Sequence, residues 1–428
     1  MKDIFVFSKR LVALVLSRRY FESIDLAEYK SGISHLLGLR IRFAIPRLIP
    51  LVSINQLIET NEQSAHDECS PGSGESLARY RRYSDDFHVS SNKQGIFAFQ
   101  DAVITKQYGI HDLQGNPVLG SVLTRGKLQD ASSYPNGYPR SISLSREAKV
   151  SEKLEEIPRA FYITYLFLNH IGHELTEVVS AVYPLLVWRR EGMDLSRVPI
   201  VVHRQFERYA GILAGVLGLD EDDILIPGVN CGPLLVKAAF FASPSFVLKS
   251  FVSPEHHGYV KNYFELVYGD AFTSMLSAIS GAQKKLYISR SRIGFRQRQF
   301  LQEKDLEREL EALGWIVFHP QECSRQEQLK MYQMSTQICG LEGSALHFLL
   351  GINTESLHRV VLLSEDDSND FVLQLVSQGI PHTVITCLEK DTYPPLVRNN
   401  INVRLRISYD PRSLAQLIDS SALGDSNI

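Results

Sequence analysis

The sequence has few cysteines, little net charge and no long apolar run, and each absence argues against a class of protein. The five cysteines among 428 residues are odd in number, widely spaced and without a CxxC pair, which argues against a disulfide framework or a zinc ribbon and for a reducing compartment. The formal net charge of −3 gives no general attraction to nucleic acid. No uninterrupted apolar run reaches about 18 residues, and the N-terminus lacks a small-residue cleavage site, so we expect neither a membrane-spanning helix nor a secretory signal.

What is present is the composition of a folded protein. Apolar residues make up 44% of the chain and charged residues 22%, both near the globular average. At roughly 150 residues per domain, the length predicts two or three domains.

The first 58 residues differ from the rest of the chain because they are basic. Residues 1–50 hold nine Lys and Arg against four Asp and Glu, and apolar stretches at 4–16 and 36–54 are interrupted by arginines. This pattern predicts amphipathic helices lying on an anionic membrane surface. The alternative is a pair of helices packed on the protein itself. Residues 59–95 are polar, with a Ser-Pro-Gly-Ser-Gly centre, and we expect a linker or loop there.

Residues 96–272 predict an α/β domain preceded by a small β-meander at about 96–125. From about residue 160, apolar runs of strand length alternate with segments of helical spacing. The predicted strands are 161–168, 199–202 and 224–226, and the predicted helices are 172–188, 205–217 and 256–272. Continuous apolar runs are typical of parallel strands that are buried on both faces.

Residues 273–428 predict a second, doubly wound α/β domain. Gly314 is the expected stop of one helix, and Ser324 with Glu327 forms the capping-box pattern of the next. The predicted strands are 286–289, 315–318, 337–340, 359–363 and 383–387, and the predicted helices are 300–313, 325–335, 344–350, 369–378 and 412–419. The two α/β halves meet near 273–283, so the default ligand site is a cleft between them.

A first candidate motif lies where the strand 161–168 gives way to a helix. It contains Asn169, Gly172, His173 and Glu177, and His173 and Glu177 are four residues apart, on one face of an α-helix. Glu177 would orient the imidazole, and His173 would accept a proton from an attacking hydroxyl. The alternative is a capping and packing cluster at a buried helix start.

A second motif follows the strand 286–289. Arg290 stands at the carboxyl end of that strand, where a guanidinium can bind phosphate oxygens in a bidentate manner. Arg292 lies on the loop that follows, and its alternative interpretation is a solvated charge.

A third motif runs from Glu342 to His347 at a strand-to-helix turn. Gly343 allows a ligand to approach the backbone, and a helix that starts near Ser344 would present free N–H groups to a diphosphate. Glu342 would repel phosphate, so we expect it to meet a ribose or sugar hydroxyl. The alternative is a tight turn capped by Ser344.

No motif predicts a metal or a cofactor. The acidic runs lack the DxD pattern of a metal-dependent sugar-nucleotide site, and the histidines lack ligand-spaced partners. We therefore expect neither.

The order and spacing of these blocks resemble glycosyltransferase family 61, the DUF563-type proteins of capsule and surface-polysaccharide loci, from about residue 95 to 390. The resemblance implies a GT-B-like fold of two facing Rossmann-like domains, with 96–272 on the acceptor side and 273–428 binding the nucleotide sugar. It implies inverting, metal-independent transfer. Its blocks place catalytic roles on His173 and Glu177, donor contacts at Ser289, Arg290, Gln328, Glu342, Gly343, Ser344 and His347, and secondary roles at Asn169, Gly172 and Arg292.

This resemblance implies a nucleotide-sugar donor and a saccharide acceptor that is lipid-linked. The basic N-terminus would then place the enzyme on the inner face of a bacterial cytoplasmic membrane, in capsule, lipopolysaccharide or exopolysaccharide synthesis. Two alternatives remain at this point. A nucleotide-sugar epimerase would need no acceptor, and a non-catalytic membrane-docked scaffold would not turn over a donor.

Overall fold

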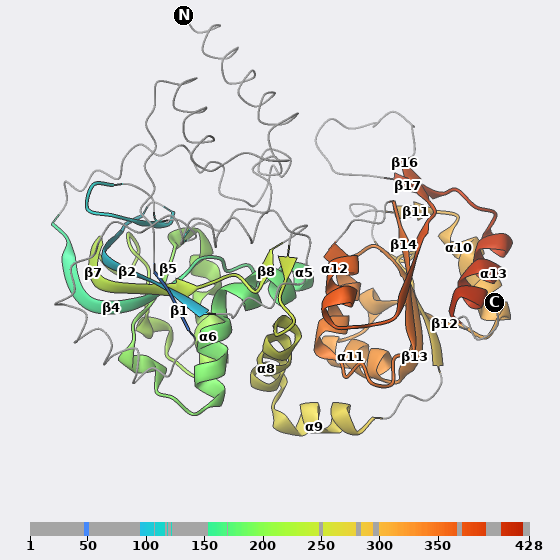
Figure 1. Ribbon diagram of the computed structural model, residues 1–428, viewed down its shortest axis with the longest axis horizontal. Helices are drawn as coiled ribbons and strands as arrows, with labels where there is room; N and C mark the ends of the chain where they lie inside the picture. The colour runs from blue at the N-terminus through green and yellow to red at the C-terminus, as the bar shows by residue number, and fades with distance from the viewer. Residues whose placement is uncertain are drawn as a thin grey trace, which may run out of the picture. The chain divides into compact units, whose positions relative to one another are not determined.

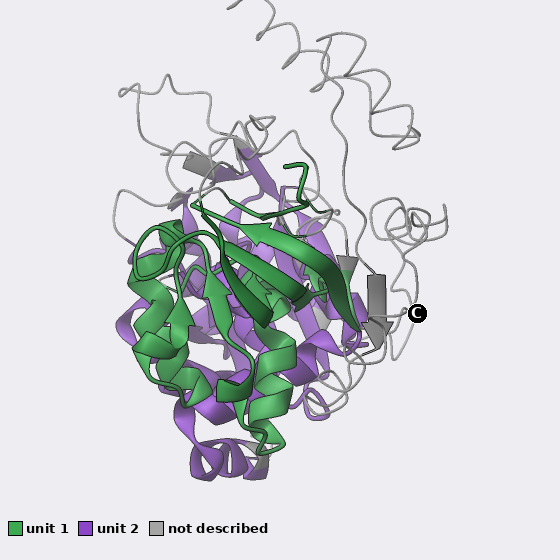
Figure 2. Cartoon of the chain, turned by 90° about the vertical axis from the view of Figure 1, so that its left-hand side faces the viewer, with its two compact units in different colours: residues 1–169, 176–253 green, residues 170–175, 254–428 purple. Residues whose placement is uncertain are grey.

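The computed structural model describes most of the chain between Gly95 and Ala422, together with one short N-terminal strand. The described residues are 47–50, 95–106, 108–115, 118, 121, 153–168, 170–247, 251–279, 284–293, 299–365, 370–390 and 404–422. They fall into two compact units (Figure 2). Unit 1 comprises the described residues of 1–169 and 176–253, and unit 2 comprises those of 170–175 and 254–428.

Unit 1 is built on one mixed β-sheet. Its strand order is β1-β2-β7-β4-β5-β6, with β3 paired to β2. Strands β7, β4, β5 and β6 are mutually parallel, whereas β2 is antiparallel to both β1 and β7. The strands are β1 (Arg47–Pro50), β2 (Gly95–Ile104), β3 (Ile110–His111), β4 (Glu155–Ile163), β5 (Ile200–Val202), β6 (Ile224–Leu225) and β7 (Leu234–Ala242).

The helices of unit 1 pack against this sheet. Helix α6 (Val179–Arg190) is one of them (Figure 1). Nine of its twelve residues are buried, and Trp188 meets Phe161 of β4 edge-on with ring centroids 5.9 Å apart. Helix α7 (Ala210–Leu217) follows a 3₁₀ turn at Arg204–Tyr209. Two further 3₁₀ turns (Leu195–Arg197, Glu221–Asp223) and a hairpin of β8 (Phe246–Val247) and β9 (Phe251–Val252) complete the unit.

The structure corrects two predictions in this part of the chain. A helix across 36–54 is wrong at 47–50, where β1 pairs with β2. Pro46 precedes this segment and Pro50 is its last residue, and proline breaks a helix interior but is tolerated on an edge strand. The rest of the predicted segments 1–58 and 59–95 lies outside the described residues, apart from Gly95. The second correction is β7, a central strand that the sequence analysis did not predict.

Unit 2 is built on a five-stranded parallel sheet. The order is β12-β10-β13-β14-β15, and every neighbouring pair is parallel. All five strands were predicted from the sequence, to within two residues at each end. They are β10 (Lys284–Ile288), β12 (Ile316–Phe318), β13 (Ser335–Leu341), β14 (Arg359–Ser364) and β15 (His382–Thr386).

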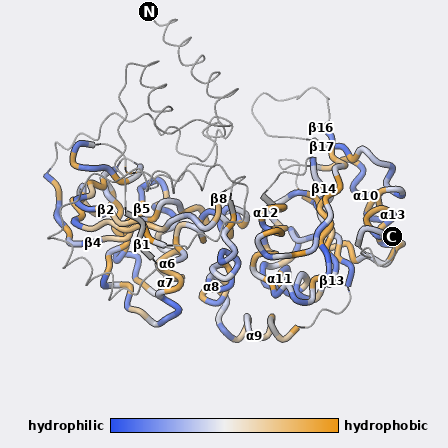
Figure 3. The backbone as a smooth tube through the Cα atoms, viewed as in Figure 1, coloured by the Kyte–Doolittle hydropathy of each residue, from blue (hydrophilic) through white to orange (hydrophobic). Residues whose placement is uncertain are grey.

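Helices cover both faces of this sheet (Figure 1). Two of them, α10 (Glu303–Ala312) and α13 (Pro411–Ala422), bury leucines in the core that contains Tyr287 and Val361. Strand β14 is hydrophobic along its centre, as expected of a strand covered on both sides (Figure 3). The other helices are α5 (Ile171–His173), α8 (His256–Tyr268), α9 (Asp270–Ala278), α11 (Arg325–Gln333) and α12 (Asp370–Ser377), with 3₁₀ segments at Pro320–Glu322 and Ser344–Gly351.

The predicted punctuation of unit 2 is present. Ser324 caps α11, and Glu327 completes the capping box. Gly314 ends the α10 segment with a φ of +82°, a value that glycine adopts without strain.

Two helix predictions in unit 2 need correction. The predicted helix 300–313 begins only at Glu303, because Phe300 and Leu301 belong to β11 (Gln299–Leu301). This strand joins β17 (Arg404–Ile407) and β16 (Leu388–Lys390) in a small sheet. The predicted helix 344–350 is a 3₁₀ helix, not an α-helix.

The strand order locates the switch point of the unit 2 sheet. In chain order it is 2-1-3-4-5: the chain passes from β10 to β12 on one side and then returns to β13 on the other. Ligands of such sheets bind beyond the carboxyl ends of the two strands where the direction reverses. In unit 2 those strands are β10 and β13.

The mixed α/β class with parallel sheets agrees with the prediction. The GT-B arrangement and the division of the chain at 272/273 stay predictions. Among the described helices, none is long and apolar enough to cross a membrane.

Candidate functional site

The loops after β10 and β13 meet at the switch point of unit 2. Arg290 follows β10, and its guanidinium lies directly against the backbone of Gly343, which follows β13. A Cβ atom built on Gly343 would overlap the Nη1 and Cζ atoms of Arg290. Glycine is therefore needed here for a close approach, and the structure brings together two residues that the sequence analysis selected separately.

A buried carboxylate supports the Arg290 loop from beneath. Glu303, the first residue of α10, is 1% exposed, and its Oε1 atom accepts hydrogen bonds from the Arg290 backbone N–H (2.7 Å) and the Tyr287 hydroxyl (3.2 Å). Burial raises the pKa of Glu303 from 4.5 to about 7, and repulsion from Glu307 acts in the same direction. The sequence analysis did not select Glu303.

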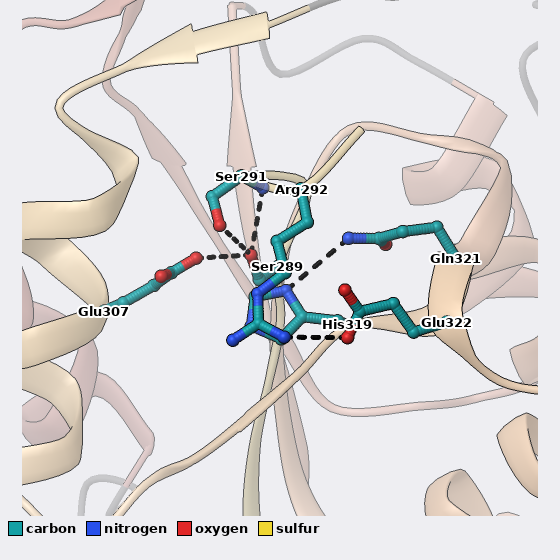
Figure 4. Close-up of polar contacts among 7 residues, drawn as sticks. All are labelled: Ser289, Ser291, Arg292, Glu307, His319, Gln321 and Glu322. Atoms are coloured by element: carbon teal, nitrogen blue, oxygen red, sulfur yellow. Dashed lines mark hydrogen bonds and ion pairs between the residues drawn. The ribbon is translucent and has the colours of Figure 1, made fainter. Parts of the chain in front are cut away.

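A second carboxylate from α10 binds the neighbouring residue of the same loop (Figure 4). The buried Ser289 hydroxyl donates a hydrogen bond to Glu307 and accepts one from the Ser291 backbone N–H at 3.0 Å. Ser289 was predicted to contact a donor, and its hydroxyl is engaged within the loop. The hydroxyl therefore shapes the loop, whereas a donor contact by Ser289 stays a prediction.

Arg292 lies further along this loop, on the surface. Its Nη1 atom forms an ion pair with Glu322 at 2.7 Å, and both side chains are about half exposed (Figure 4). Nearby, Gln321 Nε2 lies 3.5 Å from Nδ1 of His319. Partial burial and the Arg292 charge lower the pKa of His319. The exposed Arg292–Glu322 ion pair contributes little to the stability of the fold.

Glu342 fixes the loop after β13. Its Oε1 atom accepts hydrogen bonds from the Ser364 hydroxyl and from the Glu365 backbone N–H, the latter at 3.1 Å. Glu342 therefore joins the ends of β13 and β14, and this contact gives it a structural role whether or not it also meets a sugar hydroxyl.

The first candidate motif lies beside the third within unit 2. His170 Nε2 is 3.4 Å from the Ser344 hydroxyl, and a Cβ atom on Gly172 would stand 3.1 Å from Ser344 Oγ and 3.2 Å from His347 Cδ2. The His170 and His173 rings are 4.6 Å apart, centroid to centroid. Gly172 thus lets residues 170–173, the histidine segment, approach the turn at 343–347 closely.

His347 is held by α12. Its Nδ1 atom lies 2.9 Å from Gln374 Oε1, and its ring lies 4.7 Å from that of Phe371. Gln374 also donates from Nε2 to the Leu346 carbonyl at 3.1 Å. The His347 ring is therefore fixed in orientation, with its Cδ2 edge toward Gly172.

A buried ion pair anchors residues 170–175 to the rest of unit 2. Glu174 is 1% exposed and accepts two hydrogen bonds from Arg325 of α11, at 2.6 and 3.0 Å. Tyr263 of α8 donates a third at 2.7 Å. The sequence analysis missed Arg325, because only the tertiary fold brings it within reach of Glu174.

The chain forms a π-helix at Glu174–Val178, where an ordinary α-helix was predicted. His256 of α8 lies 2.9 Å from the Leu175 carbonyl and donates to it through Nε2. Complete burial lowers the pKa of His256 to about 3, so the ring is neutral at physiological pH.

The π-helix changes the spacing on which one prediction depended. Residues four apart share a face of an α-helix, whereas the π-turn is wider. Glu177 is buried in unit 1 and His173 belongs to unit 2. Their predicted pairing as a base and its orienting carboxylate stays a prediction.

Gln328 and Asn169 are two further residues that the sequence analysis placed in the site. Gln328 donates from Nε2 to the carbonyls of Pro320 and Cys323, at 2.8 and 3.1 Å, and so holds the turn after β12. Asn169 lies outside the described residues.

In unit 1 the strand ends carry aromatic rings. Tyr165 and Phe167 follow β4, whereas Phe206 and Tyr209 follow β5; the two pairs, Tyr165–Phe206 and Phe167–Tyr209, each have ring centroids 5.6 Å apart. Arg208 covers Tyr209 with its guanidinium 4.6 Å from the ring centroid. The sequence analysis did not select this cluster.

In the part of the chain that the structure describes, no group of three or more His, Cys, Asp or Glu side chains is arranged to hold a metal ion. The predicted independence from metal is not tested by this observation and stays a prediction.

Comparison with known proteins gives one family. The family model described as Glycosyltransferase 61 matches residues 154–356, which include the histidine segment, the Arg290 loop and the 342–347 turn. No curated protein matches the chain.

Proposed function

We propose that the protein is a glycosyltransferase, a proposal supported by the match of residues 154–356 to the glycosyltransferase 61 family model. In this proposal it is an inverting enzyme that transfers a sugar from a nucleotide-sugar donor to a saccharide acceptor without a metal ion. The two units form the acceptor and donor halves of a GT-B-like enzyme in this proposal.

The observation that carries the donor assignment is the contact of Arg290 with Gly343. It puts a guanidinium at the switch point of a parallel sheet, in the space that the missing side chain of Gly343 leaves. A guanidinium at this place binds the diphosphate in a bidentate manner and stabilises the negative charge that grows on the leaving nucleotide. In this way Arg290 supplies the charge that a metal ion supplies in other transferases.

His173 is the general base of the proposed reaction. It takes the proton of the attacking acceptor hydroxyl as that oxygen bonds to the anomeric carbon and the bond to the diphosphate breaks. Support comes from its place within unit 2, in the segment that adjoins Ser344 and His347. Glu177 acts by orienting the imidazole.

The acceptor is a saccharide, lipid-linked in this proposal, and it binds at the aromatic strand ends of unit 1. The half-buried Phe167 ring packs there against the buried Tyr209 ring, and ligand sites are rich in aromatic side chains. The basic N-terminus holds the enzyme on the inner face of a bacterial cytoplasmic membrane during capsule, lipopolysaccharide or exopolysaccharide synthesis.

Thermal unfolding with a panel of nucleotides tests the donor site. The panel is UDP, GDP, CMP, dTDP and ADP, each with and without EDTA. A ligand that binds only the folded protein stabilises it by about 2.7 kcal/mol at a hundredfold excess over its Kd. We expect one nucleotide to raise the Tm with EDTA present, and the shift to vanish in Arg290→Ala.

The outcomes separate the possibilities. A shift that requires a divalent ion contradicts metal independence. No shift with any nucleotide contradicts the donor site and favours a non-catalytic scaffold. Conversion of a nucleotide sugar to its isomer without an acceptor identifies an epimerase.

A further inference from the structure

The unit 2 structure contains a pair of carboxylates that the proposed reaction does not use. Glu303 and Glu307 stand four residues apart on α10, so they share one face of that helix. Both point at the loop after β10. Glu303 accepts from the Arg290 backbone N–H, and Glu307 accepts from the Ser289 hydroxyl.

Placing these two carboxylates together costs folding free energy. Two carboxylates on adjacent turns repel each other, and Glu303 is almost entirely buried. The Oε2 atom of Glu303 is buried and makes no hydrogen bond among the described residues. A buried carboxylate normally has both oxygens hydrogen-bonded, so the position of Glu303 needs an explanation.

We infer that Glu303 is a positioning residue for Arg290, which sets the place of the guanidinium in the donor site and makes the affinity for the donor diphosphate depend on the protonation of Glu303. The inference rests on the proposed function, because it concerns the same diphosphate.

Two contacts carry the positioning role. The hydrogen bond at 2.7 Å fixes the backbone from which the Arg290 side chain departs toward Gly343. The Tyr287 hydroxyl, which is buried within the sheet, fixes the carboxylate in turn at 3.2 Å. A shift at Glu303 therefore moves the guanidinium without touching the ligand itself.

Three groups act on the Glu303 charge. Glu307 on the same helix repels it, whereas the Arg290 charge and the Tyr287 hydroxyl, both from the β10 segment, favour its ionised form. When Glu303 is ionised, it offsets part of the positive charge that Arg290 presents to a diphosphate. When Glu303 is neutral, this offset is absent, so the diphosphate binds more tightly.

The experiment measures donor binding against pH in the full chain. The probes are UDP-glucose, UDP-N-acetylglucosamine, GDP-mannose and dTDP-glucose, whose diphosphate is esterified at both ends and does not titrate near neutral pH. The variants are Glu303→Gln, which keeps the acceptor without the charge, and Glu303→Ala, which removes both. Glu311→Gln on the exposed side of α10 is the matched control.

We expect the affinity of the wild-type protein to fall about threefold or more between about pH 6 and about pH 8, on either side of the Glu303 pKa of about 7. Glu303→Gln should keep the tighter affinity across this range, and Glu303→Ala should bind about tenfold more weakly, with the loss in KM for the donor and not in kcat. Glu311→Gln should follow the wild-type protein.

A second measurement does not depend on any ligand. The Arg290 amide resonance, assigned by its change in Arg290→Lys, should move with a midpoint near pH 7 in the wild-type protein and stay still in Glu303→Gln. This readout holds even if Glu303→Ala fails to fold.

The outcomes are distinct. If a nucleotide sugar binds the wild-type protein but Glu303→Gln retains the pH dependence, or the Arg290 amide does not titrate, the positioning role is wrong and the proposed function stands. If no probe binds the wild-type protein at either pH, the proposed function fails and the inference fails with it.

Discussion

The residues that follow the parallel strands differ in chemistry between the two units. In unit 2, the residues beyond the strand ends are charged or hydroxylic: Ser289 and Arg290 after β10, Glu342 after β13 and Ser364 at the end of β14, with Glu303 beneath. In unit 1, the equivalent places after β4 and β5 hold aromatic rings. Both sets of residues lie beyond the carboxyl ends of parallel strands, so this position alone does not distinguish them.

The side chains make the distinction. In the proposed reaction the diphosphate needs fixed positive charge, and in unit 2 the Arg290 guanidinium beside Gly343 is the group proposed to supply it. In the proposed reaction the saccharide meets the half-buried Phe167 ring of unit 1, which packs on the buried Tyr209 ring beside the exposed Arg208. The contrast teaches that the loops, and not the parallel strands that carry them, decide the chemistry at the strand ends.

The largest expected effect breaks the charge network of unit 2. Arg325→Met should lower the free energy of unfolding by about 3 kcal/mol, because it leaves the buried Glu174 carboxylate without its cation. In unit 1, Tyr183→Phe removes a buried hydroxyl that donates to the Gly95 carbonyl at 2.6 Å and lies 3.2 Å from Ser243 Oγ. It should cost only about 1 kcal/mol, because neither partner is charged. Urea unfolding of both variants compares them, and equal losses would contradict the contrast.

The next largest effect is on nucleotide affinity, which should depend on the arginine of unit 2 and not on that of unit 1. Arg290→Ala should weaken nucleotide binding about a hundredfold, or about 2.8 kcal/mol, because it removes the charged contact with the diphosphate. Arg208→Ala, which removes an exposed arginine from the aromatic edge, should leave nucleotide affinity within about twofold. Calorimetric titration measures both. A larger loss in Arg208→Ala would move the donor site to unit 1.

A third effect comes from His256, which unit 2 buries as a neutral ring. Its pKa falls from 6.5 in the unfolded chain to about 3 in the folded protein, so the unfolded state binds more protons between these values. Stability from this group is present above about pH 6.5 and is lost as the pH falls, by about 2 kcal/mol at about pH 5. Unfolding free energy measured at both pH values checks the loss.

The comparison for His256 needs a corrected background. Glu303 has a raised pKa of about 7, so its contribution has the opposite sign: it is present below about pH 4.5 and is lost as the pH rises toward 7. Measurements in Glu303→Gln remove this opposing slope. His256→Gln, whose amide can still donate to the Leu175 carbonyl, should then show a flatter profile. An unchanged slope in that variant would exclude His256 as its source.

The smallest expected effect is at Gly343. A methyl group there overlaps the end of the flexible Arg290 side chain, which can move away, so Gly343→Ala should leave the Tm nearly unchanged. Nucleotide affinity should fall about tenfold, because the guanidinium is displaced from the switch point. Gly351→Ala is the contrasting variant, since its methyl group overlaps the buried Phe264 ring and should lower the Tm. A wild-type affinity in Gly343→Ala would refute the close approach as a donor feature.

Much of unit 2 was predictable because its signals are local. Continuous apolar runs gave the five strands, and Ser324 with Glu327 marked the start of α11. Unit 1 was less predictable. Strand β7 reads Leu-Leu-Val-Lys-Ala-Ala-Phe-Phe-Ala, and its alanines and lysine carry weak strand propensity. The tertiary pairing with β2 and β4 decides it.

The candidate site divides in the same way. Arg290 and Gly343 were found because residues at strand ends can be read from the sequence. Glu303, Glu307 and Arg325 were missed, because their roles depend on which side chains the packing of α10 and α11 brings into reach. The π-helix at Glu174–Val178 was missed because residue propensities do not separate it from an α-helix.

The fixed amide of Gln374 has a consequence for the proton inventory of the site. Its nitrogen is committed to the Leu346 carbonyl, so the oxygen faces His347 and can only accept. Nδ1 of His347 must therefore carry the hydrogen, in one tautomer. Any proton that this imidazole gains or loses therefore passes through Nε2 alone. Gln374 of α12 thus determines which ring nitrogen of His347 can take part in proton transfer.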